Sequence, residues 1–599
     1  MRWSLIPAFL LCITSGAMAQ RLPELRYTLR VSAEDTTAVD VAMRVRGAGT
    51  TFRVAFAKHP EYDDRYWRYV EGMRAESPRG QATLTREDSA VWRVAAPAGE
   101  ATLRWRLRIP REPAPRAAWR PFLSPTGALI GGIHTFPYLI GAERTPATVA
   151  LEAPAGWRVA TALDSVGPAI FRASDAAMLV ESPILLGRLR EWRFDVRGVP
   201  HRVVYWPKPN AEPFDTLAFV DGTQRFANEA VALFRGTPYR AYTFLYRDDA
   251  YGALEHPASV TLGAPSERLA RDKHGALEET AHEFFHTWNL MSIRPAEYRP
   301  IDHRAIEPVP VLWFSEGLSM FYADLLTRRA GLPTEDSTRT AHVAGLLGRY
   351  LGNPAHARFS PEAISRVAYG AGPGALGDYD AGPHLVGELL GTALDLMIRD
   401  RTDGRRSMDD VMRLLYRRFG GAARGIASTD VQRAVAETCQ CDARPFFDAH
   451  VRGAELLEMN RWLAVVGMRA RTTREPARGA EGPAPDWRMR GWVPAGDSTL
   501  RLLVLTPSSV WARAGLHTGD RLLGFGGAPV RSWPELRGVL TRLRIGDTVR
   551  VEFIPSGASA PRALSFPMTG YDQVVVAIEP LPDATPRQRR LGAAWLAAR

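Results

Sequence analysis

Lysine is almost absent from this sequence: of 76 basic residues only Lys58, Lys208 and Lys273 are lysines, and the others are arginines. The net charge is +11 at pH 7, yet the arginines are interleaved with Asp and Glu along the chain. Proteins that bind nucleic acid or an anionic membrane through charge concentrate their basic residues in a patch or a run. The scattered pattern favours a mixed charged surface and does not predict a nucleic-acid partner.

Long apolar runs are also missing. A short one, Leu5–Ile13, follows Arg2 and precedes Ala17-Met18-Ala19, a small-x-small cleavage pattern. This run is too short for a membrane span, and no later stretch approaches the necessary length. The pattern predicts a signal peptide over residues 1–19 and a mature chain that begins at Gln20. We therefore expect an exported protein, periplasmic or secreted, without a membrane span.

Cysteine is scarce as well, and only Cys439 and Cys441 would remain after cleavage of the signal peptide. With one residue between them they would form a strained disulfide at best. They also lack the two further soft ligands that a tetrahedral metal site needs. We interpret them as free thiols or a small local redox feature and assign them no function.

At 599 residues the chain exceeds the size of one hydrophobic core, so about three domains are expected. Residues 20–200 read as β structure, because Gly, Pro, Asp and Ser separate short alternating or β-branched runs. The aromatic segment Glu61–Gly72 is interpreted as core packing of a loop rather than as a binding surface. The prediction is a β-sandwich-like domain without chemistry of its own. Its expected strands are Leu25–Val31, Val39–Val45, Thr51–Phe56, Ala101–Ile109 and Trp157–Ala160.

Residues 275–294 predict a helix that carries two histidines on one face, because apolar residues recur at three- and four-residue spacing and no proline precedes Pro295. His282 and His286 are four residues apart, so their imidazoles project one turn apart and can share a metal ion. Glu283 lies about 100° around the helix, where it can hold a water molecule rather than the metal. This is the H-E-x-x-H pattern of zinc peptidases.

The next helix, expected over Val311–Leu326, supplies the third ligand. Glu316 stands there among residues suited to burial, and an ionised Glu is almost never buried without a partner. A zinc ion is such a partner, and two His plus one Glu leave a fourth position for water. The rival acids are Glu278 and Glu279, whose side chains point back toward the N-terminus of the first helix.

Two further residues between 201 and 460 are candidates for the site. Glu255 precedes the expected strand Ser259–Gly263, and a strand beside the metal can pair with a substrate backbone. The Glu255 carboxylate lies either near the metal or in a solvated loop. Tyr379 stands just ahead of Pro383, which suits a first helical turn, and could aim its phenol into the cleft. Other expected elements are the strands Val203–Trp206 and Tyr242–Tyr246, the helices Thr216–Phe234, Asp378–Asp400, Ser407–Phe419 and Thr429–Glu437, and a glycine-rich rim at Gly370–Gly377.

Residues 485–572 have the small-residue turn, the Ala-Gly-Leu helix end and the Gly-Asp-x-Leu-Leu strand entry of a PDZ domain. PDZ domains capture an extended peptide along a sheet edge, often by its C-terminal carboxylate. The unit is either such a binding module or a purely architectural one. Residues 573–599 are expected to be a C-terminal tail, with a short arginine-bearing helix or a frayed end at Pro586–Arg599.

These motifs together resemble the glycyl aminopeptidase family of gluzincin zinc metallopeptidases. The resemblance implies a multi-domain α+β chain with three domains: an N-terminal β domain, a thermolysin-like and mostly helical zinc peptidase domain, and a PDZ domain. The family usually has basic residues where Met291 and Ser292 stand and a lysine where Ala381 stands, so a preference for glycine is not implied. The stretches that carry the resemblance are Gly252-Ala-Leu-Glu-His256, His282-Glu-Phe-Phe-His-Thr-Trp-Asn289 with Arg294-Pro295, Trp313-Phe-Ser-Glu-Gly317, and Tyr379 with Gly382.

By this resemblance His282, His286 and Glu316 would bind one zinc ion and Glu283 would be the general base. Glu255 would hold the free amino group of the substrate, and Tyr379 would stabilise the tetrahedral oxyanion. The expected protein is a zinc-dependent aminopeptidase that acts on peptides. Two alternatives stay open: a metalloendopeptidase of the same fold, and a PDZ adaptor whose peptidase domain is degenerate.

Overall fold

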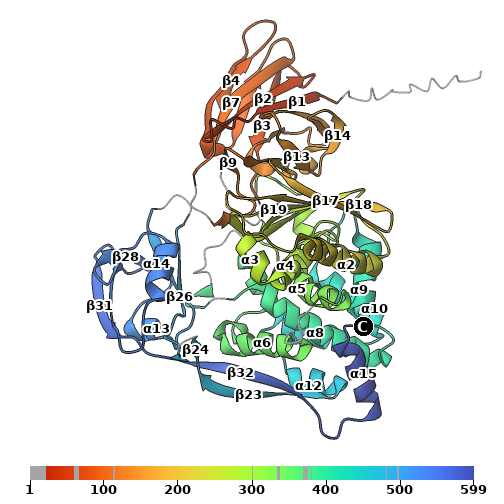
Figure 1. Ribbon diagram of the computed structural model, residues 1–599, viewed down its shortest axis with the longest axis vertical. Coiled ribbons are helices and arrows are strands. Elements are labelled where there is room, and N and C mark those ends of the chain that lie inside the picture. The colour runs from red at the N-terminus through yellow and green to blue at the C-terminus, as the bar shows by residue number, and fades with distance from the viewer. Residues whose placement is uncertain are drawn as a thin grey trace, which may run out of the picture.

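The computed structural model describes residues 22–59, 66–111, 115–299, 301–305, 307–332, 338–368, 376–379, 381–479, 482–494 and 498–599. The predicted signal peptide and most of the predicted glycine-rich rim lie outside these residues. Figure 1 shows a β-rich part at the top, a helical part in the middle, and a C-terminal unit, in blue, to one side of the helical part. The chain is therefore a multi-domain α+β protein with an N-terminal β-rich domain, as predicted.

The N-terminal domain is built from one large and two small sheets, and the predicted strands form within one or two residues of their expected ends. Alternate residues of β1 and β2 point into its core, as the patterns of buried and exposed residues show. Tyr66 and Trp67 are also buried, in agreement with core packing of that aromatic segment. The strands of the large sheet lie in the order β14 (Asp164–Gly167), β15 (Ile170–Ala173), β12 (Ala147–Glu152), β1 (Glu24–Arg30), β2 (Ala38–Arg46), β7 (Glu100–Arg108), β4 (Val70–Glu76). One small sheet has the order β13 (Arg158–Thr161), β16 (Pro183–Gly187), β10 (Gly127–Gly131), β9 (Phe122–Ser124). The other small sheet has the order β11 (Pro137–Leu139), β3 (Thr51–Phe56), β6 (Val91–Ala95), β5 (Thr83–Arg86).

A five-stranded sheet covers the helices on the side of the N-terminal domain. Its order is β17 (Arg190–Val196), β18 (Val199–Trp206), β19 (Tyr242–Arg247), β22 (Ser259–Gly263), β21 (Ala253–His256). Because β17 pairs with β18 in this sheet, the domain begins before residue 190 rather than at the expected residue 201. One face packs on Phe122 and Leu185 of the N-terminal domain, and the other face packs on helices. The edge strand is β21, not the expected Ser259–Gly263, which is paired on both sides.

The helices beneath this sheet share one continuous apolar core. Three of them matter for the site: α4 (Lys273–Phe285), α5 (Leu312–Arg329) and α8 (Pro383–Thr402). The others are α1 (Ala176–Val180), which belongs to the N-terminal domain, and α2 (Thr216–Phe234), α3 (Ser266–Arg271), α6 (Arg339–Gly352), α7 (Pro361–Ala368), α9 (Met408–Phe419), α10 (Ser428–Cys439), α11 (Arg444–Phe447) and α12 (Met459–Leu463).

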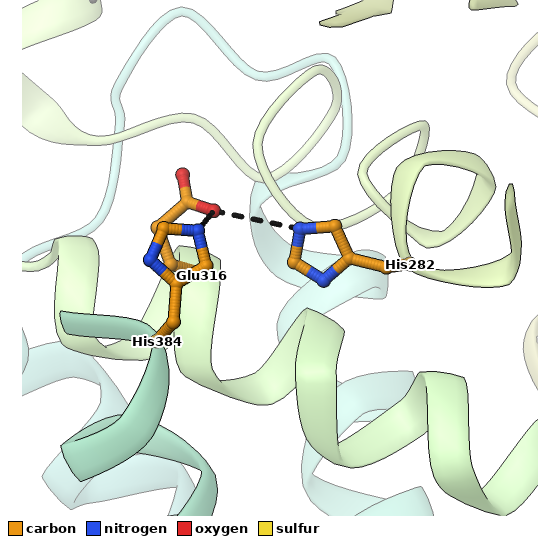
Figure 2. Close-up of side chains that lie close together, drawn as sticks. All are labelled: His282, Glu316 and His384. Carbon is orange, nitrogen blue, oxygen red and sulfur yellow. Dashed lines mark ion pairs between the residues drawn. The ribbon is translucent and has the colours of Figure 1, made fainter. Parts of the chain in front are cut away.

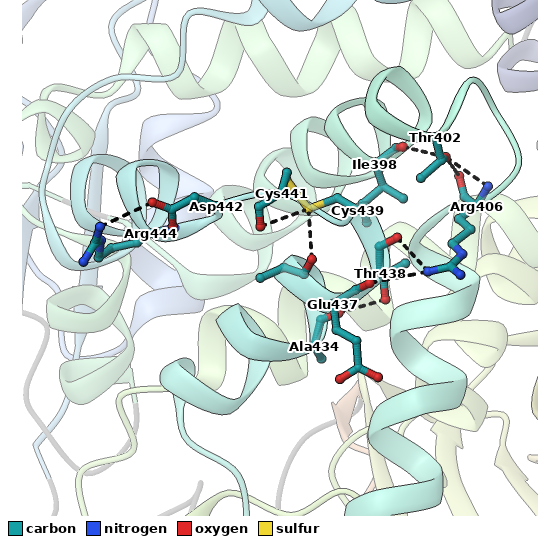
Figure 3. Close-up of a disulfide and its surroundings, with 11 residues drawn as sticks. Ile398, Thr402, Arg406, Ala434, Glu437, Thr438, Cys439, Cys441, Asp442 and Arg444 are labelled. Atoms are coloured by element: carbon teal, nitrogen blue, oxygen red, sulfur yellow. Dashed lines mark hydrogen bonds and ion pairs between the residues drawn. A yellow bond between two sulfur atoms is a disulfide. The ribbon is translucent and has the colours of Figure 1, made fainter.

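Cys439 and Cys441 are joined in a disulfide and are not free thiols (Figure 3). Gln440 between them caps α10 in the left-handed conformation, with φ of 54°. This turn brings the two Cα atoms to 5.2 Å, a separation that ordinary disulfides have. Sequence spacing alone suggested strain because it does not show the turn.

The C-terminal unit contains a sheet in the order β26 (Met489–Trp492), β27 (Leu500–Val504), β28 (Arg521–Phe525), β30 (Thr548–Ile554), β31 (Arg562–Pro567), and β29 (Ala528–Pro529) pairs with β28. Helices α13 (Val510–Ala514) and α14 (Trp533–Leu540) cover its core around Trp511 and Leu536. The remaining short strands are β8 (Arg116–Ala117), β20 (Ala250–Tyr251), β24 (Arg478–Gly479) and β25 (Gly482–Pro483).

Residues 573–599 are not a loose tail. Strand β32 (Asp572–Pro580) pairs with β23 (Met468–Pro476) in a long ribbon that runs below the helical domain (Figure 1). The last helix, α15 (Pro586–Leu596), then buries Trp595 completely in the core of that domain. Both ends of the C-terminal unit are therefore tied to the helices that carry the site.

Candidate metal centre

Three side chains predicted as ligands meet at one point between α4 and α5. The Nε2 atoms of His282 and His286 are 3.0 Å apart. The Oε2 atom of Glu316 lies 3.3 Å from Nε2 of His286 and 3.7 Å from Nε2 of His282. His286, Glu316 and His282 are buried, with at most 7% of each residue exposed. The structure thus brings together residues that are about 30 positions apart in the sequence.

Helix α4 ends sooner than predicted, and its end orients His286. The helix stops at Phe285, and the chain turns through Asn289 instead of continuing to residue 294. His286 Nδ1 lies 3.0 Å from the Asn289 carbonyl oxygen, so the ring donates there and turns Nε2 toward Glu316. Asn289 Nδ2 donates to the carbonyls of Phe314 and Ser315 at 3.1 and 3.0 Å, which fixes the start of α5 beside the histidine.

The charges at this point call for a cation. Burial lowers the pKa of His282 to about 4. Burial also opposes a charge on His286, but the carboxylates of Glu316 and Glu255 outweigh it and raise the pKa of His286 to about 10. Burial would raise the pKa of Glu316, yet His286 and His384 hold it well below its usual range. Without a metal, a proton on His286 supplies the positive charge that buried Glu316 needs.

Glu283 and Glu255 lie together beside the histidines. One potential ligand atom from each of Glu255, Glu283 and His286 falls within 4.8 Å of the others. Burial and, second, the neighbouring Glu255 raise the pKa of Glu283 well above its usual range. The Oε2 atom of Glu283 is buried and has no hydrogen-bond partner in the described part of the chain. This oxygen is suited to accept a proton from a water or substrate group that enters the site.

The rival acids are engaged elsewhere. Glu279 forms an ion pair with Arg268 at 2.8 Å, and Glu278 groups with Asp324 and His342. The Tyr379 hydroxyl accepts a hydrogen bond from Arg358, which leaves its own O–H as a donor. No hydrogen bond or ring contact among the described residues joins Tyr379 to His282, His286 or Glu316.

His384, in the first turn of α8, was missed by the sequence analysis. Its Nε2 atom lies 3.0 Å from Oε2 of Glu316, the same oxygen that faces His282 (Figure 2) and His286. Its side chain is 46% exposed, whereas that of Glu316 is 4% exposed. The missing signal was tertiary: α8 crosses α5 with Gly387 against Gly317, next to Glu316.

The donor set fits zinc. Zinc is bound at about 2.0–2.2 Å by imidazole nitrogen and carboxylate oxygen, so tetrahedral donors lie about 3.3 Å from one another. The three measured separations of 3.0, 3.3 and 3.7 Å bracket that value. Two buried imidazoles and one carboxylate are the ligands of catalytic zinc sites that keep one position open.

Comparison with known protein families gives two matches, one in the N-terminal domain and one in the helical domain. A sequence model of the M61 glycyl aminopeptidase matches residues 276–374, and a model of the peptidase M61 N-terminal domain matches residues 26–188. The chain thus matches the M61 glycyl aminopeptidase family in its N-terminal domain and in part of its helical domain. It is therefore a zinc metallopeptidase, and the M61 match spans His282, His286 and Glu316. No protein of curated function matches the chain.

Solved structures also resemble this chain. An aminopeptidase N family protein from Idiomarina loihiensis aligns at a TM-score of 0.75 with 20% identity, over 94% of this chain and 99% of its own. At this identity the likeness establishes the fold. An M1 zinc metallopeptidase from Deinococcus radiodurans aligns at a TM-score of 0.47 with 16% identity, over 73% of this chain and 94% of its own.

Proposed function

We propose that this M61 protein is an exported aminopeptidase that removes N-terminal residues from peptides. The observation that carries the proposal is the position of Glu255. This acid lies on β21, at the edge of the sheet, and reaches the same space as Glu283 and His286. A peptide that pairs with this edge would place its first residues beside the metal. A buried carboxylate there would hold the α-ammonium group and stop the peptide one residue from its end.

Metal binding and proton transfer would be carried out by different side chains. His282, His286 and Glu316 would hold the zinc ion, which supplies Lewis acidity and lowers the pKa of a water molecule when it is bound. Glu283 accepts the proton of the attacking water on Oε2 and delivers it to the leaving amine. Burial and, second, the neighbouring Glu255 raise its pKa, so this carboxylate is a stronger base toward that proton than an exposed glutamate. The oxyanion role that the resemblance gives to Tyr379 is compatible with this contact, because a hydroxyl that accepts from Arg358 can still donate its own proton.

The test removes the carboxylate of Glu255. We expect Glu255→Ala to lower kcat/KM on a free-amine tripeptide by about 10- to 100-fold, because a hydrogen bond to a charged group contributes about 1.5–3 kcal/mol. The N-acetylated tripeptide, a poor substrate from the start, should change by less than about threefold because it has no ammonium group to lose. Glu279→Ala on α4 is the matched control, since Glu279 pairs with Arg268 and not with the predicted ligands.

Equal losses on both tripeptides would instead favour a metalloendopeptidase of the same fold. A protein that binds no zinc would favour the third possibility, a peptide-binding adaptor with a degenerate peptidase domain. A single profile of a free-amine peptide library, with and without a chelator, separates all three.

For the C-terminal unit we propose a PDZ domain that binds a peptide C-terminus. Its sheet ends at β26, and α14 packs beside that edge strand, so a bound peptide would pair with β26 next to α14. For the location we propose the periplasm or the medium, on the basis of residues 1–19. No helix in the described ranges is both long and apolar enough to cross a membrane.

A further inference from the structure

We propose that His384 is a fourth protein ligand of the zinc ion in the substrate-free enzyme and must leave that position before a peptide reacts. This inference rests on the proposed zinc site of His282, His286 and Glu316. It adds a residue that neither the H-E-x-x-H pattern nor the third-ligand argument supplies. It also changes the resting centre from one with an open position to one that is closed by its own chain.

One oxygen atom of Glu316 lies among the imidazoles of three histidines. Three imidazole Nε2 atoms surround Oε2 of Glu316: His384 at 3.0 Å, His286 at 3.3 Å and His282 at 3.7 Å. A carboxylate oxygen offers about two lone-pair sites, so three imidazoles cannot all donate to it. Four donors around one ion, in contrast, are expected to lie about 3.3 Å apart. The arrangement is thus that of four ligands and not of an acceptor with three donors.

The position of His384 relative to His282 agrees with this. One ligand atom from each of His282, Glu316 and His384 lies within 4.8 Å of the others. The rings of His282 and His384 are nearly parallel, 28° apart, with centroids at 5.8 Å, so both present an edge toward Glu316 (Figure 2). A small closure on binding an ion would complete a tetrahedron of three nitrogens and one oxygen.

The helix behind His384 limits how far it can drift. Backbone atoms of α5 and α8 touch where Gly317 meets Gly387, and a Cβ built on Gly387 would stand 1.8 Å from the Trp313 carbonyl. His384 lies one turn before this crossing and Glu316 lies beside it. The other ligands are deeply buried, but 46% of the His384 side chain is exposed. It is therefore the ligand that an incoming peptide or water can displace.

A displaceable ligand has consequences that activity alone does not report. Zinc should leave the protein faster when His384 is replaced, because one of four bonds is lost. A small zinc-binding molecule should bind better to the variant, because it no longer competes with an imidazole. The coordination spectrum of Co²⁺ in place of zinc should also change, since visible absorption follows the number and type of ligands.

The experiment uses the full chain loaded with Co²⁺ or zinc. We compare the wild type with His384→Phe, which keeps a ring but removes both donor atoms, and His384→Ala. The control is His450→Ala, whose imidazole bonds the Glu455 carbonyl far along the chain from the site. We expect both His384 variants to shift the Co²⁺ spectrum and to lose zinc to a chelator roughly tenfold faster or more. Acetohydroxamate should bind them roughly tenfold more tightly than it binds the wild type.

Two results would overturn the inference in distinguishable ways. If the His384 variants keep the wild-type spectrum, zinc release and acetohydroxamate affinity, then His384 is not a ligand, although the proposed peptidase stands. If the wild type itself binds neither zinc nor Co²⁺, the proposed function fails and takes this inference with it.

Discussion

Among single residues, Glu283 is the one whose proposed role, general base, can be separated from metal binding, because it lies beside the ligands without being needed to bind the metal. We expect Glu283→Gln to retain one equivalent of zinc and to lose about 10²- to 10⁴-fold in kcat, the range that general acid–base catalysis contributes. Metal analysis together with steady-state kinetics checks this. Glu279→Gln, one turn earlier on α4, should leave both quantities unchanged. A Glu283→Gln protein with normal turnover would rule out the role.

His342 provides a pH-dependent term in stability at the same scale. Its Nε2 atom lies 2.6 Å from buried Glu388. Burial opposes the charge, but Glu388, with Asp324 and Glu278 nearby, raises the pKa of His342 to about 9. Because the folded pKa exceeds the unfolded value of about 6.5, the contribution is complete below pH 6.5 and is lost as the pH rises to about 9.

The expected size of that loss is at most about 3.5 kcal/mol, since the pKa rises from 6.5 to about 9 and each pKa unit corresponds to about 1.4 kcal/mol. Urea unfolding between pH 6 and pH 9.5 measures it, on wild type and on His342→Gln, in which this part of the pH dependence should disappear. Identical slopes in the two proteins would show that His342 is not the titrating group.

At the scale of elements, the crossing of α5 and α8 sets the distance between Glu316 and His384. A Cβ on Gly317 would lie 2.2 Å from the Cα atom of Gly387, so neither position has room for a methyl group. We expect Gly387→Ala to destabilise the protein by at least about 1–3 kcal/mol, the usual cost of overpacking, and to weaken zinc binding as the helices separate.

Gly345→Ala on α6 is the matched control for that crossing, because a Cβ there meets nothing within 4 Å. It should be neutral or stabilise the helix by about 0.5–1 kcal/mol. Thermal unfolding and zinc titration of both variants make the comparison. If Gly387→Ala were as stable as the wild type, the close contact would not be what sets the spacing of the helices.

For the whole molecule, the last helix closes the peptidase domain. Trp595 is fully buried, Arg339 lies 4.7 Å above its ring, and Arg339 Nη1 donates to its carbonyl at 2.8 Å. We expect Trp595→Ala to cost about 3–5 kcal/mol of unfolding free energy, as for other buried aromatics. Denaturant unfolding measures the loss.

Leu596→Ala is the neighbouring control, since Leu596 is 41% exposed, and should change stability by less than about 0.5 kcal/mol. Equal effects of the two substitutions would mean that α15 is not part of the core. The C-terminal unit would then be attached to the peptidase domain only through the β23–β32 ribbon and contacts such as Thr518 N–H to Asp378 at 2.9 Å.

The sequence by itself determined the features that depend on local spacing and on one general rule of burial. Four-residue spacing placed His282 and His286 on one face of a helix, and alternation marked the strands of the N-terminal domain. The rule that a buried carboxylate needs a partner selected Glu316 from a different helix. These features are predictable because they depend on residues a few positions apart, or on the cost of burying a charge.

Only the tertiary structure decided where distant groups meet. It brought the His384 imidazole against the Glu316 carboxylate and formed the hydrogen bond from Arg358 to Tyr379. It also made β21, which carries Glu255, the edge of its sheet. It also joined Cys439 to Cys441 through a left-handed turn and docked residues 573–599 on the core. Each of these depends on the crossing of elements or on a backbone angle, which packing across the whole chain fixes and which no local pattern contains.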